Sequence, residues 1–235
     1  MTELGVVYQS IERADPAAVE RLSRLGVATI HEAQGRLGHM RPYLRPIYKG
    51  ARTCGTAVTV LAHPGDNWMM HVVAEVAQPG DVVVVGLTSD NTDGMFGDLL
   101  ATSFMAQGIK GLIIDAGVRD ISDLEQMGFP VWSRAISQKG TIKETIGSVN
   151  IPVVCGGCLV HPGDVVIADA DGVVVVPSAQ ASKVADMAET REAKEQHKRE
   201  RLAAGELGLD MYSMRDRLAE AGLRYINQKQ QEQEQ

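Results

Sequence analysis

The chain has 235 residues and a formal net charge of −7 at pH 7, and 44% of its residues are hydrophobic, which is enough for the core of one ordinary domain. It has no basic stripe, which argues against a nucleic-acid-binding protein, because phosphate contacts need clustered Lys and Arg. No apolar run reaches about 18 residues, and the N-terminus lacks the basic and apolar regions of a signal peptide, so we expect a cytoplasmic enzyme without membrane contact.

The chain opens with the signals of two helices and a strand. In "ADPAAVERLSRLG", Asp15 suits the N-cap, Pro16 suits the first helical position and Gly26 follows the helix. A short second helix is predicted in "TIHEAQGRLG", and the β-branched residues of "GTAVTVLAH" predict a strand.

The tripeptide Pro-Gly-Asp occurs at residues 64–66, 79–81 and 162–164. Each copy predicts a tight turn, since Pro presets φ and Gly accepts the left-handed position. The second and third copies lead into strands. The first leads into a predicted helix with apolar residues at helical spacing, namely Trp68, Val72, Val73 and Val76.

The middle of the chain predicts a β-α-β unit over residues 81–115. The strand "DVVVVGL" is followed by a polar loop, then by a helix in "MFGDLLATSFMAQG" that Gly108 closes, and then by the buried strand "GLIID". Such a unit should be parallel and right-handed.

The remainder is richer in strands and ends in a long helix. A short helix "DISDLEQMG" and a strand "PVWSRAI" precede a cluster of strands. Residues 178–204 predict a charged helix, too polar in its second part to be wholly covered by its own domain. We expect an α/β fold in a single domain over residues 1–226, with a disordered polar tail over residues 227–235.

Chemistry is expected at the carboxyl ends of the parallel strands, where open α/β sheets bind ligands. The β-α-β topology brings Asp98, at the start of a helix, to the same edge as the pair Arg119 and Asp120, which follows the strand "GLIID". Gly97 lets a ligand approach the backbone, and the free amides of Asp98, Leu99 and Leu100 at a helix N-terminus form an anion site.

Arg119 and Asp120 have both a chemical and a structural interpretation. Arg119 can hold a carboxylate or a developing oxyanion, and Asp120 is an oxygen ligand suited to Mg²⁺ or Mn²⁺. Alternatively, Asp120 caps the next helix and Arg119 pairs with Asp115 or Asp123. The anion site on the same edge favours the chemical interpretation. A keto acid chelating the metal would suit an enolate-forming reaction.

Other motifs carry weaker signals. Cys155 and Cys158 form one CxxC motif without a second Cys or His pair, and we interpret it as a glycine bend. Lys139 and Lys143 suit anion binding more than nucleophilic catalysis. His71 follows Asn67 by one helical turn and could face the same cleft. No GxGxxG or P-loop fingerprint is present.

Three segments, "GDLLATSFMAQGIKGLIIDAGVRD", "FPVWSRAISQKGTIK" and "PGDVVIADADGVVVVP", resemble the RraA-like family. Within it they resemble the branch of 4-hydroxy-4-methyl-2-oxoglutarate aldolase, also called 4-carboxy-4-hydroxy-2-oxoadipate aldolase. The resemblance implies an α/β/α-type sandwich with a long C-terminal helix, assembled as homotrimers or homohexamers with sites between subunits.

The implied activity is that of a class II pyruvate aldolase dependent on a divalent metal, Mg²⁺ or Mn²⁺. Such an enzyme cleaves 4-carboxy-4-hydroxy-2-oxoadipate to pyruvate and oxaloacetate, cleaves 4-hydroxy-4-methyl-2-oxoglutarate to two pyruvates, and decarboxylates oxaloacetate. The implied pathway is the degradation of protocatechuate or gallate.

The resemblance also implies roles for individual residues. Asp120 binds the metal directly, and Asp98 and Glu195 hold it through water, Glu195 coming from a neighbouring subunit. Glu189, Glu192 and Glu200 are the alternatives to Glu195 on the same predicted helix. Arg119 holds the keto oxygen and the enolate, with Asp98 positioning the base. The remaining implied substrate contacts are the backbone of Gly97, Asp98, Leu99 and Leu100 and the side chains of Thr141 and Lys143.

The rival interpretation is a non-catalytic RraA-like regulator of ribonuclease activity. That branch is expected to lack part of the acidic set, whereas this chain has Asp98, Asp120 and C-terminal glutamates. The preferred keto acid, the metal, and the choice between trimer and hexamer are left open by the sequence.

Overall fold

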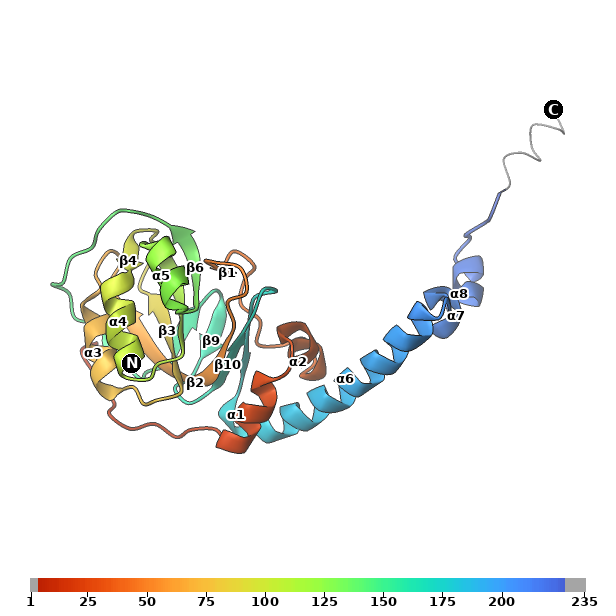
Figure 1. Cartoon of the computed structure of the whole chain (residues 1–235), viewed down its shortest axis with the longest axis horizontal. Coiled ribbons are helices and arrows are strands. Elements are labelled where there is room, and N and C mark those ends of the chain that lie inside the picture. Colours follow the sequence, from red (N-terminus) through yellow and green to blue (C-terminus); the bar gives the residue numbers. More distant parts are fainter. Residues whose placement is uncertain (1–3, 227–235) are drawn as a thin grey trace, which may run out of the picture. The chain divides into compact units, whose positions relative to one another are not determined.

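The computed structural model describes residues 4–226 (Figure 1). The chain forms two compact units that meet between Arg191 and Glu192 in the sequence, and each is described by itself. The predicted disordered tail, residues 227–235, lies outside the described residues.

One sheet dominates the first unit, and its strand order is β1-β6-β5-β3-β2-β10-β11, with β4 paired to β5 and β7 paired to β2. Its four central strands, β6, β5, β3 and β2, are mutually parallel, and the strands added around them are antiparallel except β4. The strands are β1 (Arg45–Pro46), β2 (Thr53–Ala62), β3 (Asp81–Leu87), β4 (Gly94–Phe96), β5 (Gly111–Val118), β6 (Val131–Ile136), β7 (Ser148–Val149), β10 (Val165–Ala168) and β11 (Val173–Val176).

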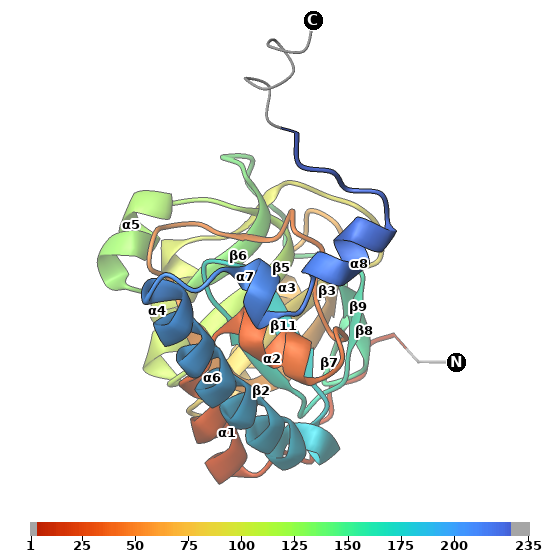
Figure 2. The same ribbon diagram turned by 90° about the vertical axis from the view of Figure 1, so that its right-hand side faces the viewer.

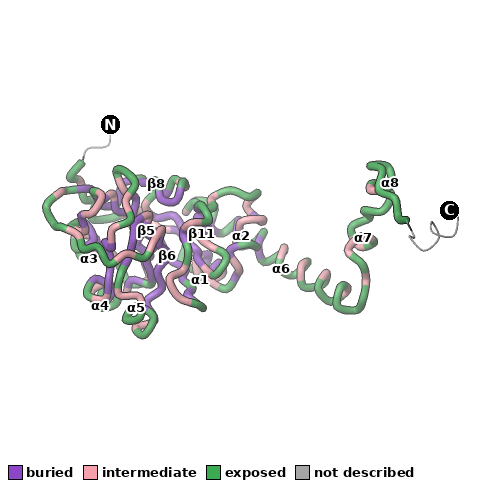
Figure 3. Tube along the Cα trace, turned by 90° about the horizontal axis from the view of Figure 1, so that it is seen from above, coloured by how far each residue is buried: buried purple, intermediate pink, exposed green. Residues whose placement is uncertain are grey.

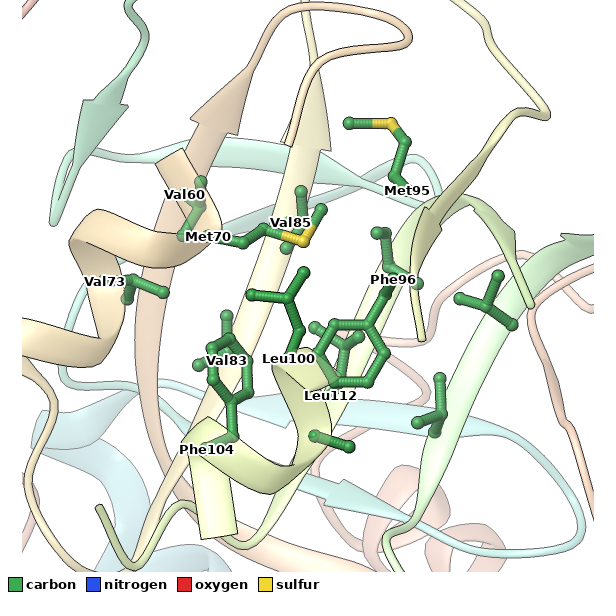
Figure 4. Close-up of a cluster of buried hydrophobic side chains, with 14 of the residues drawn as sticks. Val60, Met70, Val73, Val83, Val85, Met95, Phe96, Leu100, Phe104 and Leu112 are labelled. Atoms are coloured by element: carbon green, nitrogen blue, oxygen red, sulfur yellow. The ribbon is translucent and has the colours of Figure 1, made fainter. Parts of the chain in front are cut away.

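Helices cover one face of this sheet. Met70 of α3 and Leu100 and Phe104 of α4 point toward Val83 and Val85 of β3 (Figure 4). Farther along the same face, α1, α2 and the start of α6 pack on β10 and β11. The helices of this unit are α1 (Pro16–Ser23), α2 (Val27–Ala33), α3 (Trp68–Val76), α4 (Asp98–Ala106), α5 (Ile121–Met127), the 3-10 turn η1 (Ser178–Gln180) and the beginning of α6 (Ala181–Ala203).

The opposite face is covered by a hairpin of β8 (Val153–Cys155) and β9 (Cys158–Val160). Val82 and Val84 face this hairpin, whereas Val83 and Val85 face the helices, because side chains alternate along a strand. Burial on both faces explains why the parallel strands are continuous runs of valine and isoleucine. Figure 3 shows the buried residues concentrated along these strands.

The α/β class is confirmed, with its parallel core unit, β-rich second half and long C-terminal helix. Asp15 caps α1 through a bond from the Ala17 N–H to Oδ1 (3.1 Å), and Pro16 is the first helical residue, as predicted. Gly26 differs: it is the N-cap of α2, since α1 ends three residues earlier.

Two further differences concern the predicted β-α-β unit and the helix before it. Met95 was predicted in a helix, but Gly94–Phe96 forms β4, because these residues pair in parallel with an extension of β5. Trp68 was predicted on the apolar face of this helix, but its side chain is 42% exposed. The buried face of α3 is formed by Met69, Met70 and Val73 instead.

The second unit contains the last part of α6, α7 (Gly208–Met211) and α8 (Arg215–Glu220), which follow one another in Figure 2. Arg201 pairs with Glu206, Arg215 pairs with Asp210, and Lys198 lies over the ring of Tyr212. None of residues 192–226 is buried, and none of the helices in residues 4–226 combines the length and hydropathy needed to cross a membrane.

Candidate functional site

The strand ends of the β-α-β unit bring Asp98 beside Arg119 and Asp120, as the parallel topology predicted. The Asp98 N–H lies 3.3 Å from Oδ2 of Asp120, although 22 residues separate the two. The Arg119 N–H donates to the carbonyl of Phe96 at 2.9 Å. These bonds connect the amino-terminal end of α4 to the residues that follow the carboxyl end of β5.

A bulge in β5 delays the end of this strand. Its register against β6 shifts between Ile114 and Gly117, and the strand continues to Val118. Arg119 and Asp120 are therefore the first residues beyond the true strand end, whereas Asp115 lies within the strand. Asp115 accepts bonds from Arg134 Nε (2.8 Å) and the Gly156 N–H (2.9 Å), so its contacts are structural.

Gly97 is required by this close approach. A Cβ on Gly97 would collide with Oδ2 of Asp120 and would lie 3.1 Å from Cγ of Arg119. The absent side chain of Gly97 leaves room for the Asp120 carboxylate directly in front of α4.

Asp120 has a left-handed backbone, with φ of +57°, and its side chain makes no capping bond to α5. Oδ2 instead accepts from the Asp98 N–H and from Nε of Arg119, both at 3.3 Å. Asp120 thus stands at the N-cap position of α5, as the structural alternative predicted, but its side chain makes no capping bond there. Arg119 pairs with this neighbour rather than with Asp115.

A cavity of about 170 Å³ opens in front of α4. Its walls are the start of α3, the segment 94–100, Arg119, and the irregular segment after β6. It brings together seven residues selected from the sequence, which are Gly97, Asp98, Leu99, Leu100, Arg119, Thr141 and Lys143. Asp120 adjoins this group through its bonds to Asp98 and Arg119.

Glu195, the remaining candidate, lies on α6 in the second unit and is partly exposed. Its predicted reach into a neighbouring subunit stays a prediction.

A model of the RraA-like family, described as Aldolase/RraA, matches residues 27–175. The chain belongs to the RraA-like family. A relative from Halalkalibacterium halodurans, provisionally named 4-hydroxy-4-methyl-2-oxoglutarate aldolase, is 27% identical over 86% of this chain and 96% of its own.

Solved structures of other proteins share the fold. A protein of Pseudomonas syringae superposes with a TM-score of 0.75 at 26% identity, over 87% of this chain and all of the other. RraAS2 of Streptomyces coelicolor, described as an unusual member of the RNase ES inhibitor RraA protein family, gives 0.71 at 31% identity, over 81% and 99%. The relatives therefore include both a provisionally named aldolase and an inhibitor-family protein.

Two further polar side chains line the cavity of this RraA-like chain, Asn67 and His71, which the sequence did not select as site residues. Asn67 donates from Nδ2 to the carbonyl of Met95 (3.1 Å), and its Oδ1 is buried without a partner among the described residues. His71 lines the same cavity, one helical turn away, as its spacing allowed. The signal for Asn67 was its place directly after the first Pro-Gly-Asp turn.

Positive charge dominates the walls away from Asp98. Burial, together with the nearby charge of Lys143, lowers the pKa of His71, which favours its neutral form. Arg119 and Lys143 thus supply cations to a cavity that also has the amino end of α4. This arrangement suits a small ligand with more than one carboxylate.

The carboxylates fit a hydrated divalent cation. Within residues 4–226, no group of three or more His, Cys, Asp or Glu side chains is arranged to hold a metal ion without further ligands. Mg²⁺ does not need one, because it keeps several waters and takes one or two carboxylates. Asp120 and Asp98 can supply these, since the Asp98 carboxylate accepts no hydrogen bond from the described part of the chain.

The CxxC motif is a hairpin turn, in agreement with its structural interpretation. Cys155 and Cys158 are paired across β8 and β9, and Gly156 and Gly157 both have positive φ between them. Burial raises the pKa of the Cys158 thiol to about 11, which suppresses the reactive thiolate.

Proposed function

We propose that this protein is a divalent-metal-dependent pyruvate aldolase. It cleaves 4-carboxy-4-hydroxy-2-oxoadipate to pyruvate and oxaloacetate and 4-hydroxy-4-methyl-2-oxoglutarate to two pyruvates, and it decarboxylates oxaloacetate, in protocatechuate or gallate degradation. The observation that carries the proposal is the meeting of Asp98, Arg119 and Asp120 beside one cavity. The provisional names of its relatives support the same reaction class.

The pyruvyl half of the substrate binds at the amino end of α4. The N–H groups of Leu99 and Leu100 lie in the first helical turn, where the helix supplies no partner, and they receive the C1 carboxylate. The guanidinium of Arg119 donates to the C2 oxygen. Thr141 and Lys143 bind the distal carboxylates from the opposite wall.

Cleavage breaks the C3–C4 bond. Loss of the C4 hydroxyl proton turns that hydroxyl into a carbonyl, and the bonding electrons pass to C3 and the C2 oxygen as an enolate. Arg119 stabilises the negative oxygen more strongly than it does the starting ketone. Asp98 directs the group that takes the hydroxyl proton, and a proton delivered to C3 releases pyruvate.

Asp120 would hold Mg²⁺ or Mn²⁺ directly, and Asp98 would hold it through water. The metal supplies Lewis-acid stabilisation of the oxyanion, in addition to that from Arg119. Exhaustive EDTA treatment should abolish pyruvate release, and added Mg²⁺ should restore it. Full activity after metal removal would refute the metal requirement.

The test of the proposed reaction is pyruvate release from 4-carboxy-4-hydroxy-2-oxoadipate with Mg²⁺. Wild type should turn over, and Asp120→Ala should lose at least about 100-fold in kcat, the scale for removing a preorganised electrostatic group. Equal rates would remove Asp120 from the mechanism. No release from wild type would favour the second candidate function, regulation of a ribonuclease, which the description of RraAS2 supports.

We also propose that the protein is a homotrimer or homohexamer in which Glu195 completes a neighbour's site. The support is that the second unit exposes large apolar side chains, among them Leu207, Tyr212 and Tyr225, and buries none of residues 192–226. Mixed oligomers of Asp120→Ala and Glu195→Gln subunits test this arrangement. Activity should reappear in the mixture if Glu195 acts across subunits, and should stay absent if it acts within one chain.

A further inference from the structure

One wall of the cavity carries Thr141 and Lys143. This wall is an irregular segment, residues 137–147, which contains no helix. On one side it is tied to the loop before β4, through the Gly94 N–H to the carbonyl of Lys139 (2.8 Å) and an ion pair of Lys139 Nζ with Asp93 (3.1 Å). On the other side it meets the first Pro-Gly-Asp turn.

Asp66 of that turn is 1% exposed, and its carboxylate bonds in two directions. Oδ2 accepts from the N–H groups of Glu144 (2.8 Å) and Thr145 (2.6 Å). Oδ1 accepts from the Trp68 N–H (2.9 Å), at the start of α3. A single buried carboxylate therefore joins the helix that begins after Asn67 to the segment that carries Thr141 and Lys143.

Main-chain bonds flank this carboxylate. The Ile142 N–H donates to the carbonyl of Gly65 (3.0 Å), and the Asn67 N–H donates to the carbonyl of Ile142 (3.1 Å). Ile142 stands between Thr141 and Lys143, so the junction lies between the two residues that line the cavity.

The other two Pro-Gly-Asp turns use their aspartates differently. Asp81 and Asp164 are also buried, and each accepts from an N–H three residues earlier, on Gln78 and His161 respectively. Asp81 also pairs with Arg13, and Asp164 also accepts from the Ser178 N–H (3.1 Å), but none of these partners lines the cavity. Asp66 instead accepts from the N–H groups of Glu144 and Thr145, which lie 78 and 79 positions farther along the chain. Among the three turn aspartates, Asp66 is therefore the one whose bonds hold the segment that lines the cavity.

We propose that Asp66 is a positioning residue that sets recognition of the substrate's distal carboxylates by holding Thr141 and Lys143 against Asn67. This inference rests on the proposed aldolase function for its substrate, while the connection itself stands on the geometry. Asp66 does not line the cavity, so it acts through the segment it holds. The anion site at α4 and Arg119 lies on separate elements and should not depend on Asp66.

The experiment compares two reactions in wild type and Asp66→Asn, which keeps the side-chain shape but loses the charge. Aldol cleavage of 4-carboxy-4-hydroxy-2-oxoadipate uses both ends of the cavity. Exchange of the pyruvate methyl protons in D₂O, followed by NMR, uses only the pyruvyl half. We expect the KM for cleavage to rise about tenfold or more, as for a displaced binding group, with kcat for cleavage and the exchange rate within about twofold of wild type.

The matched control is Asp164→Asn, which also removes a buried carboxylate that accepts two main-chain N–H groups, from His161 and Ser178, but away from the cavity. It should lower the unfolding temperature without changing KM. An unchanged KM in Asp66→Asn, or an equal rise in both variants, would overturn the inference.

Hydrogen exchange of the wild-type protein keeps the test independent of activity and of variant folding. The Glu144 and Thr145 amides should exchange far more slowly than that of Gly140, and Asp66→Asn should abolish the difference. Fast exchange of Glu144 and Thr145 in wild type refutes the connection. An inactive wild type with these two amides protected refutes the aldolase proposal and leaves the connection intact.

Discussion

The Asp98 N–H and Oδ2 of Asp120 are 3.3 Å apart. The first amide of α4 therefore donates to the carboxylate of a residue that directly follows the end of β5. This bond places a carboxylate directly beside an anion-binding helix end. The negative charge is held there by the helix amide and Arg119, which leaves the amides of Leu99 and Leu100 for a ligand.

Gly97→Ala should disable the site without unfolding the protein. The added Cβ meets the Asp120 carboxylate and Arg119, so both must move. We expect a loss of about 100-fold or more in kcat/KM for pyruvate release. The control is Gly26→Ala, whose Cβ would find only Thr29 Oγ1 at 3.9 Å, and which should keep wild-type rates.

Substitution of Asp115 should lower stability and spare activity, whereas substitution of Asp120 should lower activity and spare stability. Asp115→Asn weakens the partner of Arg134 inside the sheet and should cost about 2 kcal/mol in the free energy of unfolding by urea, with kcat nearly unchanged. Asp120→Asn should leave stability close to wild type, because Asn also accepts a left-handed backbone, and should lose catalysis. The reverse pattern would contradict both assignments.

The contribution of Asp66 to stability should depend on pH. Burial alone would raise its pKa, but main-chain bonds from Glu144, Trp68 and Thr145 lower it overall below the ordinary 3.8. Because the folded pKa is depressed, the stabilisation is complete above about pH 4 and is lost as the pH falls through the folded value. The difference in unfolding free energy between wild type and Asp66→Asn should be constant from pH 5 to 7 and shrink below pH 4.

Lys143→Met should raise the pKa of His71. Burial is the larger cause of its lowered value and remains in the variant, so the new value should still lie below the ordinary 6.5. An NMR titration of the imidazole measures the midpoint. Lys139→Met is the control, because Lys139 pairs with Asp93, and it should leave the midpoint unmoved. Identical midpoints in wild type and Lys143→Met would place the two side chains farther apart than the structure does.

Local patterns were sufficient to predict that Asp98 and Asp120 lie at the same edge of the sheet, and the structure adds the bond between them. A strand, a helix and a second strand in succession define a parallel unit, and this topology brings both residues to one edge. The bulge in β5 and the pairing of β4 could not be predicted in this way, because both depend on register against neighbouring strands.

The connection made by Asp66 is the clearest limit of the sequence. Its turn motif is repeated twice elsewhere, and nothing in the tripeptide distinguishes the copy whose aspartate bonds the segment that lines the cavity. The bonds to Glu144 and Thr145 appear only once the tertiary structure brings residues 137–147 against the first Pro-Gly-Asp turn.

The left-handed backbone at Asp120 also restricts how such a chain can change over evolution. Only residues that accept this conformation, chiefly Gly, Asn and Asp, can stand there without strain. A descendant that replaced Asp120 by Asn would lose the charge and keep the turn. Under the proposed function, catalysis could therefore be lost at this position while the backbone of the β5–α5 junction stays as it is.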